Sequence, residues 1–458
     1  MNRHKNYHIR ILEKDYKDLL THLLENPLGY EEGAFLLAGR IRGLDELIFL
    51  VRQVIPIPLN EIISQSSVHL DGKPEFIAKV LKTARRESLS VIQVHSHPFS
   101  KGSVSFSSRD DFGEKELFPK ILQRVPGVEH VALVFGQSDN FKGRVWLPDG
   151  KTIIPVASLR LVGPVIKDIS PMSKPKLYQA SDPSFDRQIR VLGLNGHYTI
   201  KNLTVGIVGL GGNGSQVVQA LARMGVGKII AVDPDNVENH NIPRLIGARK
   251  EDADNRTLKV DVMKRLVEET NNATKFIGIS EPVESTKSLN ALKGTNVIFC
   301  CTDNFASRDL LNNFAYLYLI PVIDMGLEFQ PDKSGNICRA GGYIVTIIPG
   351  YLCLHSLNII TKEALLKEKE QTRRQGYLGE KEKPTGQVLG FNGFVAHHAI
   401  IEFLNMILGF RKNSQPTYLV IDFLKNQEKR IMINQPCGRC KNLFGFGEIK
   451  EVYSKLLT

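Results

Sequence analysis

A glycine-rich loop between an apolar segment and a helical one constrains the fold of this chain more than any other feature. Residues 205–208 form a short apolar run, which is typical of a buried parallel strand. Gly209, Gly211 and Gly214 follow with the spacing G-x-G-x-x-G and open a helical segment. Glycines at this spacing permit a tight turn and let backbone N–H groups approach a phosphate. The sequence therefore predicts a strand–loop–helix unit that binds a nucleotide.

A second strand and a carboxylate extend this unit. Residues 228–232 end in Asp233, at the spacing where an acidic side chain accepts hydrogen bonds from a ribose. Taken alone, the pattern indicates only nucleotide binding, and a dinucleotide-dependent dehydrogenase is the default expectation.

Further polar residues argue against a dehydrogenase. Asp235 follows Asp233, and Asp303 follows another apolar segment, residues 297–300. Between them lie further polar and basic residues, which include Asn241, Arg244 and Lys259. An adenylating enzyme needs cations to hold a triphosphate and its developing charge, and a carboxylate to bind Mg²⁺. A dehydrogenase needs neither the basic residues nor the second carboxylate.

At these residues the chain resembles the ThiF/MoeB family, which includes the catalytic domain of ubiquitin-activating enzymes. The resemblance spans roughly residues 185–440 and implies a Rossmann-like domain with a mostly parallel sheet, which uses ATP and Mg²⁺. It implies that the nucleotide is held by Gly209, Gly211, Gly212, Gly214 and Asp233. It also implies phosphate contacts from Asn241, Arg244 and Lys259, and Mg²⁺ binding by the catalytic Asp303.

Arg187 matches an arginine that this family extends across a dimer interface into the partner's ATP site. The resemblance therefore implies a homodimer formed through this domain, with Arg187 as a catalytic residue acting in trans.

The first part of the chain carries a different pattern. Residues 47–54 resemble a strand, residues 73–87 a helix, and residues 89–94 a strand that ends at His95. Alternation along a strand puts His95 and His97 on the same face. Two imidazoles so placed, together with a carboxylate such as Asp110, form a three-ligand zinc site with one position open for water.

Here the chain resembles a second family, the JAMM (MPN-type) zinc metalloproteases, known as isopeptidases acting on ubiquitin-like conjugates. Their pattern is H-x-H-P, a short loop, S-x-x-D, and a glutamate well upstream. The resemblance covers about residues 10–150 and implies a cytidine-deaminase-like α/β domain. It implies that His95, His97 and Asp110 bind catalytic Zn²⁺, and that Ser107 helps to stabilise the tetrahedral intermediate.

The general base is assigned by its spacing to a glycine. Glu32 has the family's spacing to Gly39, and Glu31 is the alternative. The chain departs from the family pattern twice. Phe35 replaces the usual glycine. The loop before Ser107 is about one residue longer than usual, which leaves open whether Asp110 or Asp111 is the zinc ligand.

The length of 458 residues predicts two or three domains. We expect a JAMM-type domain over residues 1–160, a proline-containing linker over residues 161–183, and a ThiF/MoeB-type domain over residues 184–458. The first residues lack the apolar core of a signal peptide, and no run of 18 apolar residues appears, so a cytoplasmic protein without a membrane contact is expected.

The net charge of +11 raises the question of a nucleic-acid partner. No helix-turn-helix, RNA-recognition or finger pattern supports one. A basic surface suited to an acidic protein or a nucleotide is therefore the favoured interpretation.

The cysteines bear on two questions. Residues 361–384 correspond to a crossover loop where many family members carry an acceptor cysteine, yet none occurs between residues 356 and 435. The nearest thiols along the chain are Cys353 and Cys338, so direct transfer of the activated product to another protein is predicted.

Cys437 and Cys440 are half of a tetrathiolate zinc site. Cys353 is the single matching cysteine in the other half, where His355 is the candidate replacement for the missing ligand.

Together these features predict two enzymes joined for one ubiquitin-like protein. One would cleave a peptide or isopeptide bond after the modifier's tail, and the other would adenylate the modifier's C-terminal glycine before it passes to a conjugating enzyme. The enzymatic alternative is activation of a sulfur-carrier protein for thiamine, molybdopterin or cysteine synthesis. The non-enzymatic alternative is a scaffold that only binds a modifier, and the complete sets of site residues argue against it.

Overall fold

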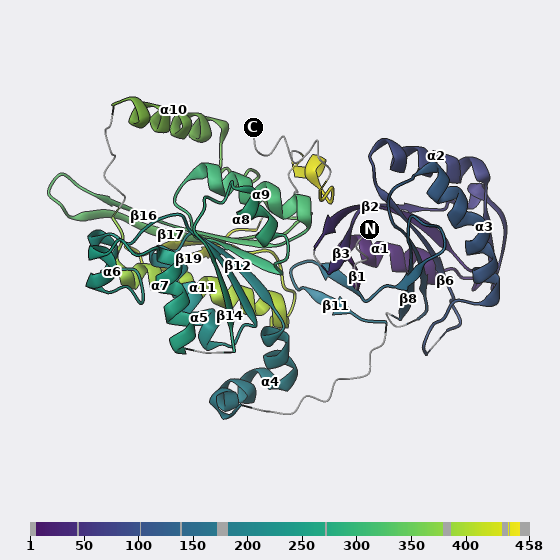
Figure 1. The fold of residues 1–458 in the computed structure, drawn as a ribbon, viewed down its shortest axis with the longest axis horizontal. Coiled ribbons are helices and arrows are strands. Elements are labelled where there is room, and N and C mark those ends of the chain that lie inside the picture. The colour runs from purple at the N-terminus through teal and green to yellow at the C-terminus, as the bar shows by residue number, and fades with distance from the viewer. Residues whose placement is uncertain are drawn as a thin grey trace. The chain divides into compact units, whose positions relative to one another are not determined.

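The computed structural model of the protein describes residues 6–43, 45–100, 102–137, 140–171, 182–270, 273–378, 386–432, 438 and 440–448. The chain forms two compact units (Figure 1). Unit 1 consists of Met1–Pro175, Leu317–Leu319 and Leu443–Thr458. Unit 2 consists of Lys176–Tyr316 and Ile320–Asn442. The expected α/β class is confirmed for the chain.

Within the described residues, unit 1 is built on a nine-stranded sheet of order β11-β10-β1-β3-β2-β6-β7-β8-β9. Its strands are β1 (Asn6–Leu12), β2 (Gly33–Arg42), β3 (Glu46–Pro56), β6 (Ser90–Ser96), β7 (His130–Phe135), β8 (Phe141–Trp146), β9 (Ile153–Pro155), β10 (Ser158–Val162) and β11 (Lys167–Ile169). A separate hairpin pairs β4 (Ile62–Ser66) with β5 (His69–Gly72). The sheet is mixed, because β6 runs parallel to β7 and antiparallel to β2.

In the described part of unit 1, three helices cover this sheet: α1 (Glu13–Leu24), α2 (Pro74–Arg86) and α3 (Ser108–Arg124). The alternation of side chains along the strands divides the apolar residues into two cores. One core contains Leu19 and Leu23 of α1, and the other contains Leu81 of α2 and Phe118 of α3. Both faces of the sheet are therefore buried, which explains why its central strands are apolar almost throughout.

The expected domain boundaries need correction at both ends. Residues 158–169, which cross the expected boundary at residue 160, form β10 and β11 of the unit 1 sheet, so the linker does not begin at residue 161. Much of the remaining linker, residues 172–181, lies outside the described residues.

The C-terminal segment also belongs to unit 1 rather than to the second domain. Arg52 on β3 donates to the carbonyl of Phe444 at 2.7 Å, and its guanidinium lies 3.6 Å from the ring centroid of Phe446. A side chain at Gly39 would lie only 2.2 Å from the Gly445 carbonyl oxygen, so glycine permits this close backbone approach. Gly39, from which the position of the general base is predicted, thus has a packing role.

Unit 2 contains, in the described part of the chain, an eight-stranded sheet of order β14-β13-β12-β15-β16-β17-β18-β19. The strands are β12 (Thr204–Val208), β13 (Lys228–Val232), β14 (Lys275–Ile279), β15 (Val297–Cys300), β16 (Val322–Pro331), β17 (Ile337–Ile347), β18 (Tyr418–Asp422) and β19 (Gln427–Arg430). Pairing is parallel from β14 to β16 and antiparallel from β16 to β19. The expected Rossmann-like sheet is confirmed, with an antiparallel extension at one edge.

The α-helices of unit 2 are α4 (Asp186–Lys201), α5 (Gly212–Arg223), α6 (Lys250–Asp254), α7 (Lys259–Thr270), α8 (Thr286–Leu292), α9 (Phe305–Tyr318), α10 (Lys362–Leu378) and α11 (Leu389–Leu408). In the part of the chain searched, α11 is long and apolar enough to cross a membrane, but more than half of it is buried inside the protein, as in a core helix. It packs on α5 and on strands β16 and β17.

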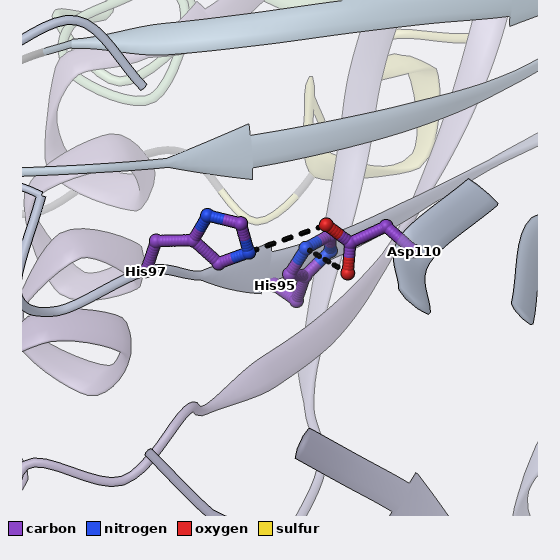
Figure 2. A group of neighbouring side chains, drawn as sticks. All are labelled: His95, His97 and Asp110. Carbon is purple, nitrogen blue, oxygen red and sulfur yellow. Dashed lines mark ion pairs between the residues drawn. The ribbon is translucent and has the colours of Figure 1, made fainter. Parts of the chain in front are cut away.

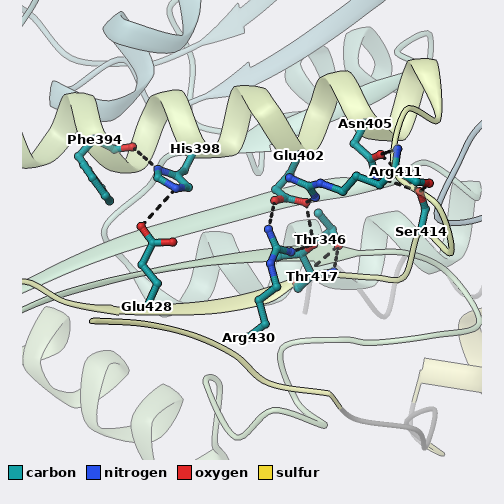
Figure 3. A network of polar contacts seen from close by, with 10 residues as sticks. All are labelled: Thr346, Phe394, His398, Glu402, Asn405, Arg411, Ser414, Thr417, Glu428 and Arg430. Atoms are coloured by element: carbon teal, nitrogen blue, oxygen red, sulfur yellow. Dashed lines mark hydrogen bonds and ion pairs between the residues drawn. The ribbon is translucent and has the colours of Figure 1, made fainter. Parts of the chain in front are cut away.

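A buried carboxylate ties α11 to the sheet (Figure 3). Glu402 accepts hydrogen bonds from Arg411 at 2.5 Å, from Thr417 at 2.7 Å and from Arg430 at 2.8 Å. Two cations and a hydroxyl therefore compensate the cost of burying this charge.

Candidate functional sites

The predicted zinc ligands meet at the end of β6 in unit 1 (Figure 2). His95 Nε2 lies 3.2 Å from Asp110 Oδ1, and His97 Nε2 lies 3.3 Å from Asp110 Oδ2. One potential ligand atom from each residue falls within 4.8 Å of the others. Among the described residues, this is the one group of three or more such side chains.

A helix cap brings Asp110 to the histidines. Ser107 precedes α3, and its hydroxyl accepts the Asp110 amide at 3.2 Å. The Ser107 amide in turn donates to Asp110 Oδ2 at 2.5 Å. The S-x-x-D pattern is thus a capping box that also fixes the carboxylate. Asp111 pairs with Arg144 at 2.5 Å, so Asp110 is the residue that joins the histidines.

The strand register corrects the predicted general base. Gly33 lies opposite His95 in the antiparallel pair β2–β6, so residue 31 falls opposite residue 97 on the same face. Glu31 Oε1 lies 3.6 Å from His97 Nε2. Glu32 belongs to the opposite face, where it accepts a hydrogen bond from Asn26 at 2.5 Å. The acid beside the histidines is therefore Glu31, and Glu32 is not placed to serve there.

The electrostatics of this cluster follow from burial and proximity. Burial raises the pKa of Glu31 above its ordinary value, although His95 and His97 oppose the shift. Burial would also raise the pKa of Asp110, but the two imidazoles lower it well below its usual range. The hydrogen bond to Asp110 raises the pKa of His97. The cluster thus combines a carboxylate held ionised with a second one whose pKa is raised.

These residues fit a zinc ion. His95 Nε2 is buried, and although Asp110 Oδ1 lies 3.2 Å away, their geometry among the described residues is not that of a hydrogen bond, so a metal ion at this nitrogen would be favourable. Two imidazoles and a carboxylate are a common donor set for catalytic zinc. A cavity of about 540 Å³ lies beside the cluster, and Glu31, His95 and Asp110 line it.

The second predicted zinc site is only partly described, because Cys437 lies outside the described residues. Asn312 bridges the other two cysteine segments, since it accepts the Leu354 amide at 2.9 Å and donates to Cys440 Sγ at 3.6 Å. Ser356, where a fourth cysteine was expected, donates its amide to Cys353 Sγ at 3.3 Å. His355 pairs with Asp309 at 2.7 Å. The structural zinc stays a prediction.

In unit 2, nearly all predicted nucleotide residues surround one cavity of about 450 Å³. The lining includes Gly209, Gly211, Gly212, Asp233, Asn241, Arg244, Lys259 and Asp303. Strands β12, β13 and β15 are parallel neighbours, so their carboxyl ends meet at the same edge of the sheet and bring these loops together.

Glycine is required at two positions of the loop. Gly209 has a φ of 89°, a conformation that residues with a side chain rarely adopt. A Cβ at Gly214 would lie 1.9 Å from the Gly209 carbonyl oxygen, so Gly214 lets α5 pack against the loop. Gly214 supports the loop without lining the cavity.

Two carboxylates and a lysine form a network at the end of β13. Asp233 Oδ2 accepts the Leu210 amide at 2.6 Å, and Oδ1 accepts the Asp235 amide at 2.9 Å. Lys259 Nζ lies 2.7 Å from Asp235 Oδ2 and 3.6 Å from Asp233 Oδ1. Burial raises the pKa of Asp233, and Lys259 opposes this shift. The glycine loop is thus attached to the residue predicted to bind the ribose.

Arg244 and Asp303 fit the phosphate and Mg²⁺ roles. Arg244 donates to the His240 carbonyl at 2.7 Å, while its Nε is buried and has no partner in the described part of the chain. Burial lowers the pKa of Arg244, and Asp303 opposes this effect. A buried donor without an acceptor is costly, so an anionic oxygen at this position would be favourable. Asp303 is exposed and faces the same cavity.

The cavity also contains residues that the sequence interpretation missed. Glu284, Cys301 and Ser307 line it, and Ser307 Oγ donates to Glu284 at 3.0 Å. Cys301 follows directly on strand β15, so its place at the carboxyl end of a parallel strand was the available signal. Burial raises the pKa of the Cys301 thiol, and the nearby Asp324 adds to that shift.

Arg187 lies on α4, is exposed, and does not line the cavity. The structure therefore leaves its predicted role across a dimer interface untested.

Comparisons with known proteins point to one family. The family model described as the ThiF family matches residues 185–442, which is more than half of the chain. The adenylyltransferase and sulfurtransferase uba4 of Aspergillus fumigatus is 31% identical over 170 residues, which are 34% of this chain and 34% of that protein. The SAMP-activating enzyme E1 of Haloferax volcanii is 27% identical over 166 residues, which are 36% of this chain and 57% of that protein.

A solved structure of E. coli MccB with MccA-N7isoASN is 18% identical and has a TM-score of 0.47, with 58% of this chain and 77% of that chain covered. The chain spans about a third of the length of uba4, so the comparison covers only part of that protein. The extent of the family match nevertheless decides the family. The chain belongs to the ThiF family.

Proposed function

We propose that unit 2 is an adenylyltransferase that activates the C-terminal carboxylate of a small ubiquitin-like or sulfur-carrier protein. The observation that carries this proposal is the single cavity shared by the glycine loop, Asp233, Arg244, Lys259 and Asp303. A site for a dinucleotide does not require two cations and an exposed carboxylate around the phosphates.

In the proposed reaction, a carboxylate oxygen of the substrate attacks the α-phosphorus of ATP, an acyl adenylate forms, and pyrophosphate leaves. Arg244 and Lys259 would bind the phosphate oxygens on which negative charge increases. Asp303 would hold Mg²⁺, which neutralises charge on the phosphates and the leaving pyrophosphate. Asp233 would orient the ribose, because the Leu210 amide fixes its carboxylate beside the loop.

Sulfur-carrier activation is the favoured role, with transfer to a conjugating enzyme as the second possibility. The uba4 relative is named an adenylyltransferase and sulfurtransferase, which supports a product that receives sulfur. The archaeal relative is named for activating SAMP, which supports a small protein as the substrate. Both names belong to those proteins, and their extension to this chain is part of the proposal.

A homodimer with Arg187 acting across the interface completes this proposal. The exposed position of Arg187 on α4 and its absence from the cavity lining of its own chain support a role in trans. A cytoplasmic location is proposed with it, because ATP is the required substrate.

We further propose that unit 1 is a zinc hydrolase of JAMM type, which cleaves a peptide or isopeptide bond at the tail of the same small protein. The arrangement of His95, His97 and Asp110 beside Glu31 supports this activity. Zinc held by these three residues would supply a water whose pKa is lowered to about 7. Glu31 would accept a proton from the attacking water and deliver it to the leaving amine. Ser107, next to the cluster, would stabilise the tetrahedral intermediate through its hydroxyl.

The test is ATP–pyrophosphate exchange with candidate small proteins encoded near this chain's gene. Exchange that depends on one of them, on Mg²⁺ and on an intact C-terminal glycine is expected. NAD binding more tightly than ATP would refute the adenylyltransferase. A thiocarboxylate on the small protein, detected by mass spectrometry after a sulfur donor is added, would separate sulfur transfer from conjugation.

A further inference from the structure

We propose that Glu368, on the charged helix α10, is a positioning residue for the Mg²⁺-binding end of the nucleotide cavity. This inference rests on the proposed adenylation. It concerns a helix whose composition predicts only a solvated surface or loop, because lysine, arginine and glutamate dominate it. Glu368 differs from its exposed neighbours Lys367 and Lys369, since it is half-buried and contacts another element.

The contact is bidentate and joins two elements of unit 2. Glu368 Oε1 accepts the Phe305 amide at 2.8 Å, and Oε2 accepts the Ala306 amide at 2.8 Å. These are the first two residues of α9, whose amides have no acceptor within the helix. A carboxylate at a helix N-terminus also interacts favourably with the helix dipole. Glu368 thus caps α9 from a distant part of the chain.

The capped turn is part of the cavity wall. Asp303, Asn304 and Ser307 line the cavity on either side of the two capped amides. The Asn304 side chain accepts the Ser307 amide at 2.7 Å, so side chains satisfy three successive amides of this turn. A change in the position of Glu368 would therefore alter the turn that directs Asp303.

The other side of this loop is held by a buried pair. Arg308 donates to the Thr302 carbonyl at 2.7 Å and to Asp324 at 2.9 Å, and both charged side chains are buried. That attachment is fixed in the core of unit 2. Glu368 supplies the attachment from a surface helix, so it connects the position of α10 to the geometry of the Mg²⁺ site.

The test compares Glu368→Gln with Glu370→Gln, which removes the same charge from an exposed position on the same helix. In Glu368→Gln, one accepting oxygen is replaced by an amide donor that faces a backbone N–H. Hydrogen exchange at Phe305 and Ala306 is expected to accelerate at least about tenfold. The Mg²⁺ concentration for half-maximal binding of a non-hydrolysable ATP analogue, measured by calorimetry, is expected to rise about tenfold. Glu370→Gln should change neither.

Faster exchange with an unchanged Mg²⁺ midpoint would overturn the proposal, because Glu368 would then only cap the helix. Unchanged exchange at both amides would also overturn it. Glu368→Asp, which keeps the charge on a shorter side chain, should lie between wild type and Glu368→Gln in both measurements. If the wild-type protein does not bind the ATP analogue at any Mg²⁺ concentration, the proposed adenylation fails and this inference fails with it.

Discussion

Gly33 lies directly opposite His95 in the antiparallel pair β2–β6, and this register decides which of two adjacent glutamates faces the cluster of His95, His97 and Asp110. Side chains alternate between the faces of a sheet, so Glu31 shares a face with His95 and His97. Glu32 packs on the other face, next to Asn26 and 3.9 Å from His22.

This register makes Glu31 the residue to test. Glu31→Gln is expected to lower cleavage of a small protein with an extended tail by roughly 10²–10⁴-fold, because the variant cannot accept a proton. Zinc content, measured by elemental analysis, should stay at the wild-type level, since the three ligands remain. His97→Ala should lose both zinc and activity.

Glu32→Gln is the matched control for this prediction. It removes the neighbouring charge on the opposite face and should leave most of the cleavage activity. The reverse pattern, with Glu32→Gln inactive and Glu31→Gln active, would show that the base is assigned wrongly. Wild-type cleavage that persists in phenanthroline would exclude a metal-dependent hydrolase altogether.

The two glutamates also mark a limit of sequence interpretation. The H-x-H-P and S-x-x-D patterns predict their own local geometry, because alternation on one strand and a capping box need no distant partner. The base depends on how β2 pairs with β6, and a shift of one residue exchanges the two faces. The spacing to Gly39 favours Glu32, but glycine is required there because the C-terminal segment approaches its backbone closely.

The nucleotide cavity was easier to predict. Its residues follow directly on strands of a parallel sheet, so sequence order alone places their side chains at one edge. Glu284 and Cys301 were missed, although both lie in loops that follow strands. Glu368 could not be found this way, because its partners are backbone amides more than 60 residues away.

Asp303→Ala is expected to reduce Mg²⁺-dependent pyrophosphate exchange by about 10²-fold or more, because it removes the carboxylate proposed for the metal. Asp303 is exposed, so the melting temperature should hardly change. Exchange assays at rising Mg²⁺, together with calorimetric melting, check both expectations. A variant that melts normally and still exchanges at the wild-type rate would remove Asp303 from the mechanism.

Mixing Arg187→Ala with Asp303→Ala protein tests the proposed dimer. If Arg187 acts in trans, a mixed dimer contains one intact site, and random exchange of protomers restores up to about a quarter of the wild-type activity. If Arg187 acts within its own chain, every site lacks one residue and no activity returns. Each variant alone serves as the control, and gel filtration at the assay concentration reports whether dimers are present.

Direct transfer of the activated product predicts that no thioester forms on this protein. Cys301 is the thiol in the cavity, but burial raises its pKa, and the thiolate is the reactive form. Mass spectrometry after incubation with ATP and the small protein should therefore reveal no thiol-sensitive adduct, while Cys301→Ser should keep pyrophosphate exchange within about twofold. An adduct that disappears in Cys301→Ser, or in the equivalent variant of the buried Cys353, would identify an acceptor cysteine instead.

The Glu402 network predicts a dependence of stability on acid pH (Figure 3). Burial would raise the pKa of Glu402, but Arg411, Arg430 and Thr417 lower it below its ordinary value of 4.5. A carboxylate whose pKa is lower in the folded state stabilises the fold fully above pH 4.5, and this contribution is lost as the pH falls through the folded-state pKa.

Glu402→Gln should therefore lower the free energy of unfolding at pH 7 by roughly 1–3 kcal/mol, since it removes the charge that both arginines bind. The loss is expected to be no larger, because both arginines are partly exposed and can turn toward water. The difference between variant and wild type should shrink below pH 4.5, as the wild-type carboxylate is protonated. Glu428→Gln breaks only the exposed pair with His398, drawn in the same view, and should cost less than about 0.5 kcal/mol. Urea unfolding of the three proteins at pH 7 and pH 4 measures these differences. An equal loss at both pH values would mean that Glu402 stabilises unit 2 through packing, and that its charge contributes little.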